Sequence, residues 1–320
     1  MDLAYPDRLP LIPDGILRQY KVHEPHDTRF RAAARLLQAI WRHKRDLPMG
    51  NYVNGKGRRK PLGSRLGALP AAAGANFLDP ALRRLALREL AYREPGAMID
   101  DHRVWSNMLS SMPLAFNLFG ALKLNPDLAN AVCGALWPTL CQEVCHIQFE
   151  HSPARGDIKF TADGTAFDVF IICRDASGAK TFIAVEVKYS EGMQEPEPRR
   201  RDRYDELLET CGLYSDPSDR ALLANPIQQL CREHMLGHCL ITNRLFDAGV
   251  FVCVAPQLND PAQRACTLYS QQLAASGDTC GFESLTLEAL VGAIREAGAA
   301  DFAAALDERY CDFTPVHDLI

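Results

Sequence analysis

Two apolar segments near the middle of the chain constrain the fold more than any other feature, because each carries charged residues inside a strand-like run. The segments are AFDVFIICRD at 166–175 and TFIAVEVKYS at 181–190, separated by the turn residues Asp, Ser and Gly. Runs of this length, rich in Val, Ile and Phe, are typical of β-strands. A third run, GVFVCVA at 249–255, is entirely apolar and predicts a central strand buried on both faces.

The charges in the first two segments predict a chemical site. Side chains alternate between the two faces of a strand, so Glu186 and Lys188 are expected on the same face, and Asp168 interrupts the preceding strand. Buried charges are costly unless a partner compensates them. Two carboxylates and a strand carbonyl suit Mg²⁺, and a lysine beside them can activate an attacking water. A structural salt bridge between Lys188 and either acid is the alternative, and these residues alone leave both interpretations open.

Helical periodicity dominates the rest of the chain. We predict helices at 28–46, 79–94, 104–122, 127–144, 200–212 and 226–240, and two more in the last forty residues. Asp79 followed by Pro80, and Asn225 followed by Pro226, are typical of helix starts. Pro113 and Pro138 are expected to kink or interrupt their helices. CHIQFE at 145–150 predicts one further strand, and the glycine-punctuated basic segment that follows the first long helix predicts a loop.

The net charge of −5 hides a strong segregation of charge along the chain. Eleven basic residues face one acid between Arg29 and Arg65, Arg58, Arg59 and Lys60 among them, whereas acids predominate from residue 278 onward. A second basic run comprises Arg199, Arg200, Arg201 and Arg203. Such clusters can neutralise phosphates of a nucleic acid. A solvated basic surface without a ligand is the alternative.

Composition places the chain among soluble proteins, and we expect a cytoplasmic location. No apolar run approaches the ~20 residues that a membrane helix needs, and the first fifteen residues lack the basic-then-apolar order of a signal peptide. None of the eleven cysteines forms a Cys-x-x-Cys pair, so we expect reduced, buried thiols. His234 and His238 could bind zinc by their spacing, but ordinary helix residues explain them better.

The spacing of FD at 167–168 and EVK at 186–188, with a strand, a turn and a strand between, resembles the PD-(D/E)xK nuclease superfamily. Phe167 stands where that family has its name-giving proline. The chain is most similar to a bacterial branch described as putative restriction-endonuclease-like. The segments that carry this similarity are SSMPLAFNLFG at 110–120, FEHSPARGD at 149–157, AFDVF at 166–170 and AVEVKYSE at 184–191.

The resemblance implies a role for each matching residue. Asp168 and Glu186 would be the metal-binding acids, together with the main-chain carbonyl of Val187, and Lys188 the catalytic lysine. Many family members place a Gln or Arg on the helix after the third strand, which makes Gln229 and Arg232 candidates for positioning phosphate or a metal-bound water. An additional acid before the second strand would be Glu150 or Glu143. We prefer Glu150 because it lies in a segment that carries the resemblance.

The resemblance also implies the fold and the reaction. The expected fold class is α/β, a restriction-endonuclease-like αβββαβ core with a mixed sheet flanked by helices. We expect a basic helical extension at 1–100, the core at 101–260 and an acidic helical extension at 261–320. The expected activity is Mg²⁺- or Mn²⁺-dependent endonucleolytic hydrolysis of DNA, without a membrane partner, and a homodimer is the arrangement that many relatives use to cut both strands. An inactive module that binds nucleic acid or a protein is the alternative.

Overall fold

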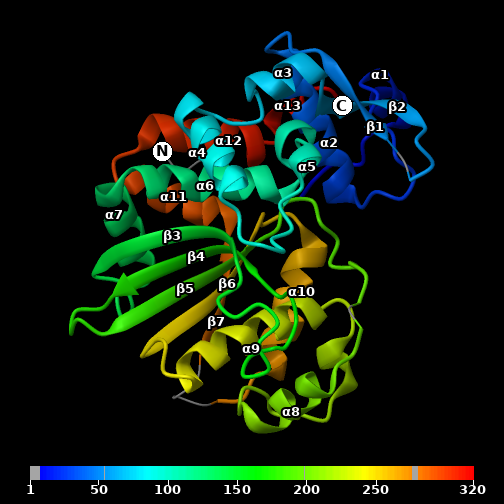
Figure 1. Ribbon diagram of the computed structural model, residues 1–320. Helices are drawn as coiled ribbons and strands as arrows, with labels where there is room; N and C mark the ends of the chain where they lie inside the picture. Colours follow the sequence, from blue (N-terminus) through cyan, green and yellow to red (C-terminus); the bar gives the residue numbers. More distant parts are fainter. Residues whose placement is uncertain (1–7, 54, 198, 276–279) are drawn as a thin grey trace.

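A mixed sheet of five strands forms the centre of the molecule in a computed structural model, which describes residues 8–53, 55–197, 199–275 and 280–320 (Figure 1). In spatial order the strands are β3 (Glu143–His151), β4 (Phe167–Arg174), β5 (Lys180–Val187), β6 (Ala248–Ala255) and β7 (Gly281–Thr286). The β3–β4 and β4–β5 pairs are antiparallel, whereas β6 runs parallel to both of its neighbours. The flanked mixed sheet confirms the expected α/β, restriction-endonuclease-like class.

Helices cover both faces of the sheet because β4, β5 and β6 are apolar on both sides. The flanking helices are α6 (Ser111–Leu124), α7 (Pro126–Leu136), α11 (Leu287–Glu296) and α12 (Ala300–Tyr310) on one side, and α8 (Asp202–Thr210), α9 (Gln228–Thr242) and α10 (Asp260–Gln272) on the other. Val185 and Val187 pack into the first core, and Phe182 and Ala184 pack into the second. Burying apolar surface on both faces is the main stabilising contribution to a sheet of this kind.

The N-terminal part packs on one end of the sheet and includes a hairpin in place of the predicted basic loop. Its elements are α1 (Asp14–Gln19), α2 (Arg29–His43), β1 (Met49–Val53), β2 (Arg59–Leu66), α3 (Ala68–Ala73), α4 (Pro80–Ala91) and α5 (Asp101–Ser106). β1 and β2 pair antiparallel, and α2 covers them through buried Leu62 and Leu66. Too few apolar residues alternate in this segment for its sequence to predict strands. Asp79 caps α4 as predicted, accepting from the Ala81 N–H.

Three further predictions about helix boundaries were wrong. The helix expected at 104–122 is two helices, α5 and α6, separated at 107–110; Pro113 lies in the first turn of α6, where a missing N–H costs little. The helix expected at 127–144 ends at Leu136, and β3 begins soon afterwards. Asn225 does not cap α9, which begins at Gln228 after the short 3₁₀ helix η1 (Arg220–Leu223).

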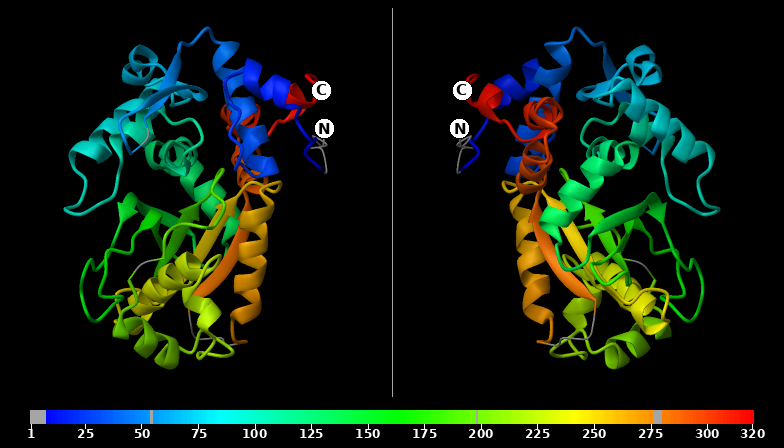
Figure 2. Two further views of the ribbon diagram at one scale, coloured as in Figure 1. Left: turned by 90° about the vertical axis from the view of Figure 1, so that its right-hand side faces the viewer. Right: turned by 90° about the vertical axis from the view of Figure 1, so that its left-hand side faces the viewer.

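The C-terminal part contains the two predicted helices but also completes the sheet. β7 joins the edge of β6, where the sequence predicts helical structure, and α13 (Thr314–His317) follows α12. β7 mixes polar and apolar residues because it is half exposed at the sheet edge, which hides the strand pattern. Figure 2 shows α12 beside α2, so the two ends of the chain share one core. The division at residues 100 and 260 remains a prediction.

Two of the predictions fall on residues outside the described ranges. The expected non-signal start includes residues 1–7, and the first acid of the tail is Asp278; both lie outside the described residues. All eleven cysteines are free, and Cys145 is the exposed one among them. In the described part of the chain, no helix is long and apolar enough to cross a membrane.

Candidate active site

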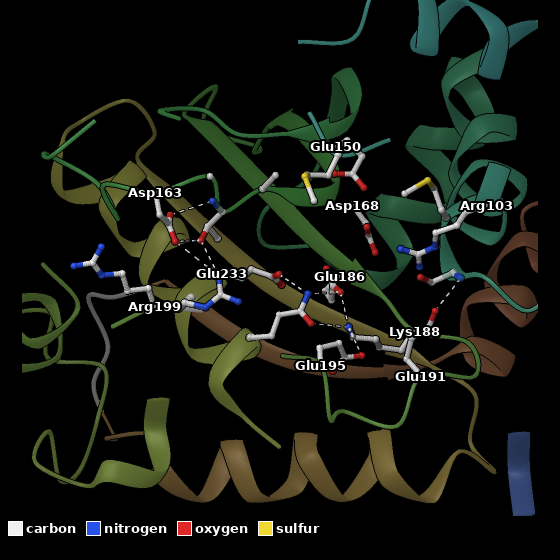
Figure 3. A pocket seen from close by; sticks show the side chains of 18 of the residues that line it. Arg103, Glu150, Asp163, Asp168, Glu186, Lys188, Glu191, Glu195, Arg199 and Glu233 are labelled. Carbon is white, nitrogen blue, oxygen red and sulfur yellow. Dashed lines mark hydrogen bonds and ion pairs between the residues drawn. The ribbon is translucent and has the colours of Figure 1, made fainter. Parts of the chain in front are cut away.

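Sheet register brings three carboxylates to one level of the sheet. Phe149 and His151 of β3 pair with Val169 and Phe167 of β4, so Glu150 lies opposite Asp168. The pair Val169–Val185, continued by one residue, places Asp168 opposite Glu186 of β5. Opposite residues on neighbouring strands share a face, with Cβ atoms about 5 Å apart. Figure 3 shows Glu150, Asp168 and Glu186 one after another along this row.

The lysine of the predicted site follows directly after β5. The Lys188 N–H donates to the Val254 carbonyl, which fixes the backbone beside β6. Its Nζ lies 2.9 Å from Oε1 of Glu186 and 3.7 Å from Oε1 of Glu195, and it donates to Oε1 of Gln229 at 2.7 Å. Lys188 and Glu186 are each only 4% exposed. The buried ammonium therefore sits among acceptors from three segments of the chain.

Helix α9 connects the lysine to a further acid that the sequence reasoning missed. The side-chain amide of Gln229 donates to Glu186 at 2.8 Å and to Glu233, four residues later, at 2.9 Å. Glu233 is buried, and its Oε2 has no hydrogen-bond partner among the described residues. The i,i+4 spacing from Gln229 is the only sequence signal that could have identified this acid. One amide thus holds two carboxylates beside the lysine.

The carboxylates lie closer together than like charges favour. Burial, followed by the charges of Glu186 and Glu150, raises the pKa of Asp168 well above its ordinary value, although the Val187 N–H donates to its Oδ2 at 2.9 Å. Burial and the charge of Glu186 raise the pKa of Glu150 to about 7, and both effects also raise the pKa of Glu233. This repulsion means that a bound cation would stabilise the ionised site.

The electrostatics of Lys188 have the opposite sign. Burial alone would lower its pKa, but the surrounding carboxylates, Glu186 and Glu195 foremost, raise the pKa well above its ordinary value. The side chain is therefore a fixed positive charge at neutral pH and donates, rather than accepts, hydrogen bonds. A group of this kind can stabilise negative charge or orient a water molecule.

The donor set fits a divalent metal ion in part. Among the described residues, no three His, Cys, Asp or Glu side chains already form a complete metal-binding group. Glu186, which is buried, and Asp168, which is partly buried, nevertheless offer two carboxylates at the wall of one cavity. Mg²⁺ is commonly held by one or two carboxylates, with water and substrate phosphate as its other ligands. Two protein acids with room for water satisfy this requirement.

A cavity of ≈ 560 Å³ lies over the carboxylate row. Six of the site residues predicted from the sequence line this cavity: Glu150, Asp168, Glu186, Lys188, Gln229 and Arg232. Glu143, the competing acid, is exposed at the start of β3 and does not line this cavity. Arg232 donates to Oγ1 of Thr165 at 3.0 Å and lies 3.8 Å from Asp163, which holds its guanidinium at the wall.

The arginines around the cavity include only some of the predicted basic residues. Arg103 of α5 and Arg199 of the segment after β5 line it (Figure 3), and Arg201 of the same segment also does. The second basic run had indicated Arg199 and Arg201, whereas nothing in the sequence had indicated Arg103. Arg58, Arg59 and Lys60 lie on the β1–β2 hairpin and line no part of this cavity. Lys60 forms an ion pair with Glu24 at 2.7 Å.

Comparison with known proteins identifies the family. A family model described as the PD-(D/E)XK nuclease superfamily matches residues 25–312, which is most of the chain. No curated protein and no solved structure gave a significant match. The match covers the N-terminal hairpin and β7 as well as the strands that carry the acids. The chain therefore belongs to the PD-(D/E)XK nuclease superfamily.

Proposed function

We propose that the protein is a metal-dependent endonuclease that hydrolyses phosphodiester bonds of DNA. The observation that carries this proposal is the juxtaposition of Asp168 on β4, Glu186 on β5 and Lys188 directly after β5. The arrangement lies under a cavity with an arginine-rich rim, in a chain of a nuclease superfamily. The positive rim suits a polyanionic substrate, and the acidic centre suits a divalent cation.

The proposed metal ligands are Asp168, Glu186 and the main-chain carbonyl of Val187, with Mg²⁺ or Mn²⁺ as the ion. When bound, the ion would neutralise charge on the phosphoryl oxygens and lower the pKa of a bound water. Gln229 holds Glu186 in place, and Glu150 supplies a further acid at the same level of the sheet.

The remaining roles follow from the charges of the side chains. Lys188, held as an ammonium, orients the hydrolytic water and stabilises negative charge that develops on the phosphoryl group. Arg232 at the cavity wall positions the phosphate, and in the proposed interface Arg58, Arg59 and Lys60 contact DNA farther away. In-line attack of water on phosphorus breaks the bond to the 3′-oxygen and leaves a 5′-phosphate and a 3′-hydroxyl.

A second candidate function is supported by the hydrogen bonds of the lysine. Lys188 already contacts Glu186, Gln229 and Glu195, so its charge is compensated without any ligand. A nuclease fold that binds nucleic acid or a protein without turnover would keep such a network as a structural ion pair. The two functions differ in whether Mg²⁺ produces cleavage.

The test compares Lys188→Ala with Lys180→Ala, which removes a lysine at the exposed start of the same strand. Plasmid, single-stranded DNA and RNA are incubated with each purified protein in Mg²⁺, Mn²⁺ or EDTA. We expect cleavage by the wild type and by Lys180→Ala, and a loss of at least about a hundredfold in Lys188→Ala. Circular dichroism checks that each variant is folded. Cleavage by folded Lys188→Ala at the wild-type rate would refute the mechanism, and binding without cleavage by the wild type would favour the second function.

A further inference from the structure

A second cavity adjoins the candidate active site and has no role in the proposed chemistry. It measures ≈ 430 Å³ and lies between α2, the β1–β2 hairpin, α5 and the segment after β5. Arg103 and Glu191 line both cavities, so the two spaces meet at these residues. A strand that leaves the active-site cavity past Arg103 therefore enters the second one.

The second cavity has more positive than negative charge. Four arginines line it: Arg31, Arg35, Arg65 and Arg103. Arg31 and Arg35 share a single acid, Asp27, which lies behind the cavity wall. Of the acids at the wall, Glu24 pairs with Lys60, and Glu191 accepts from the main-chain N–H groups of Ser111 and Tyr189.

Arg65 is the arginine whose environment points most clearly to an anionic ligand. Its Nη1 contacts Nδ1 of His102 at 3.1 Å and Oγ of Ser106 at 3.5 Å, and neither partner carries a negative charge. Its Nε is buried without a hydrogen-bond partner among the described residues. Burial and the nearby charge of Arg35 lower the pKa of Arg65. A phosphate in the cavity would place an acceptor and a negative charge beside this guanidinium.

An aromatic side chain stands beside this guanidinium. Tyr52 of β1 lines the cavity, is 43% exposed, and has its ring centroid 5.9 Å from Cζ of Arg65. An exposed aromatic ring next to an arginine matches the two parts of a nucleotide, because bases stack on aromatic rings and phosphates bind guanidinium groups. A paired base is already stacked on both sides within a duplex, so only an unpaired base can use Tyr52 in this way.

We propose that the cavity binds one unpaired nucleotide of the substrate strand next to the scissile phosphodiester, with its phosphate on Arg65 and its base on Tyr52. A volume of ≈ 430 Å³ accommodates a small-molecule-sized group but no double helix. The inference rests on the proposed nuclease function and names its substrate class, which is a nucleic acid with a single-stranded segment at the cleavage position.

Binding without turnover tests the inference. Fluorescence anisotropy in EDTA measures the affinity of a labelled single-stranded oligodeoxynucleotide and of its blunt duplex for Tyr52→Ala, Arg65→Ala and the control Arg84→Ala. Arg84 is exposed on α4 and lines neither cavity. We expect Tyr52→Ala and Arg65→Ala each to weaken single-strand binding about tenfold. Arg65→Ala also reduces the slope of log K against log salt by about 0.7, the value for one phosphate contact on a single strand.

Each result decides one question. Binding by both variants like that of Arg84→Ala, or equal weakening for single strand and duplex, overturns the inference. Tyr52→Phe keeps the aromatic ring, so single-strand binding by this variant at the wild-type affinity supports stacking. If Arg65→Ala fails to fold, Tyr52→Ala decides alone, because its partly exposed ring leaves the core intact. The plasmid assay with Lys188→Ala reports separately on the nuclease function, since the anisotropy measurement requires no hydrolysis.

Discussion

At the residue scale, the site is a row of carboxylates whose ionised forms are disfavoured by burial and by one another. The three are Glu150, Asp168 and Glu186. Each carboxylate raises the free energy of its ionised neighbours, and Lys188 and Gln229 offset part of that cost. Substituting one member therefore changes the protonation of the others, so single-residue effects at this row will not add.

A second buried network, away from the cavity, predicts that the protein loses stability as the pH falls. His234 of α9 contacts the Tyr269 hydroxyl at 2.8 Å and the Cys280 carbonyl at 2.7 Å. Burial lowers its pKa to about 4, despite the opposing effect of the Cys280 carbonyl. The unfolded chain, with an ordinary histidine pKa near 6.5, binds the proton first as pH falls. His234 therefore contributes stability above pH ~6.5 that is lost on acidification towards pH ~4, on the order of 3 kcal/mol in total.

Urea denaturation between pH 7.5 and 4.5 measures this effect. We expect the free energy of unfolding of His234→Gln to fall less steeply with acidification than that of the wild type. His43→Gln, at the exposed end of α2, serves as the control and should follow the wild-type curve. Parallel curves for His234→Gln and the wild type would contradict the prediction.

At the scale of elements, packing against β6 fixes the strands that carry the site. The Phe182 ring of β5 stacks on Phe170 of β4 with centroids 5.4 Å apart, and Gly249 of β6 lies directly against it. The absence of a side chain at Gly249 lets β6 and β5 pair at this point. The apolar run at 249–255 predicted the strand, but only the pairing explains why it begins with a glycine.

Gly249→Ala should therefore destabilise the protein, because the new Cβ would overlap the buried Phe182 ring. We expect a loss of about 1–3 kcal/mol in the free energy of unfolding, as for other overpacked cores. Gly281→Ala on the neighbouring strand β7 is the matched control, since its Cβ meets Val250 at an ordinary 3.4 Å. Its effect should stay below about 1 kcal/mol. Equal urea midpoints for the two variants would argue against this account.

At the scale of the whole molecule, one buried arginine joins parts of the chain that are far apart in sequence. Arg309 of α12 donates to the Asn76 carbonyl at 2.7 Å and to Oε1 of Gln38 at 3.4 Å. Its Cζ lies 4.3 Å from the Trp41 ring centroid and 4.9 Å from that of Tyr310. The N-terminal helices and α12 are thus held against each other by a fully buried cation.

Arg309→Ala should cost at least about 3 kcal/mol of unfolding free energy, because it removes a buried group whose partners then lose their hydrogen bonds. Arg45→Ala is the control: Arg45 lies over the same Trp41 ring at 4.3 Å but is 37% exposed and pairs with Glu308. We expect it to cost below about 1 kcal/mol. Similar denaturation midpoints for the two variants would rule out the linking role of Arg309.

The sequence by itself determined the elements whose residue pattern lies within one short stretch of the chain. The strands at 167–174, 180–187 and 248–255 are largely apolar, and Asp168, Glu186 and Lys188 were evident because charges are rare in and directly after such runs. The first two of these strands carried part of the family resemblance, which the family match over residues 25–312 confirmed.

Only the tertiary structure decided which other side chains meet these three. Glu195 and Arg103 come from separate segments, and no spacing in the chain indicates that they meet at the site. The β1–β2 hairpin and β7 were likewise missed, because their polar and apolar residues do not alternate clearly and their strands exist through pairing with a neighbour. Local patterns report which residues are buried, whereas contacts between distant segments depend on how the whole chain packs.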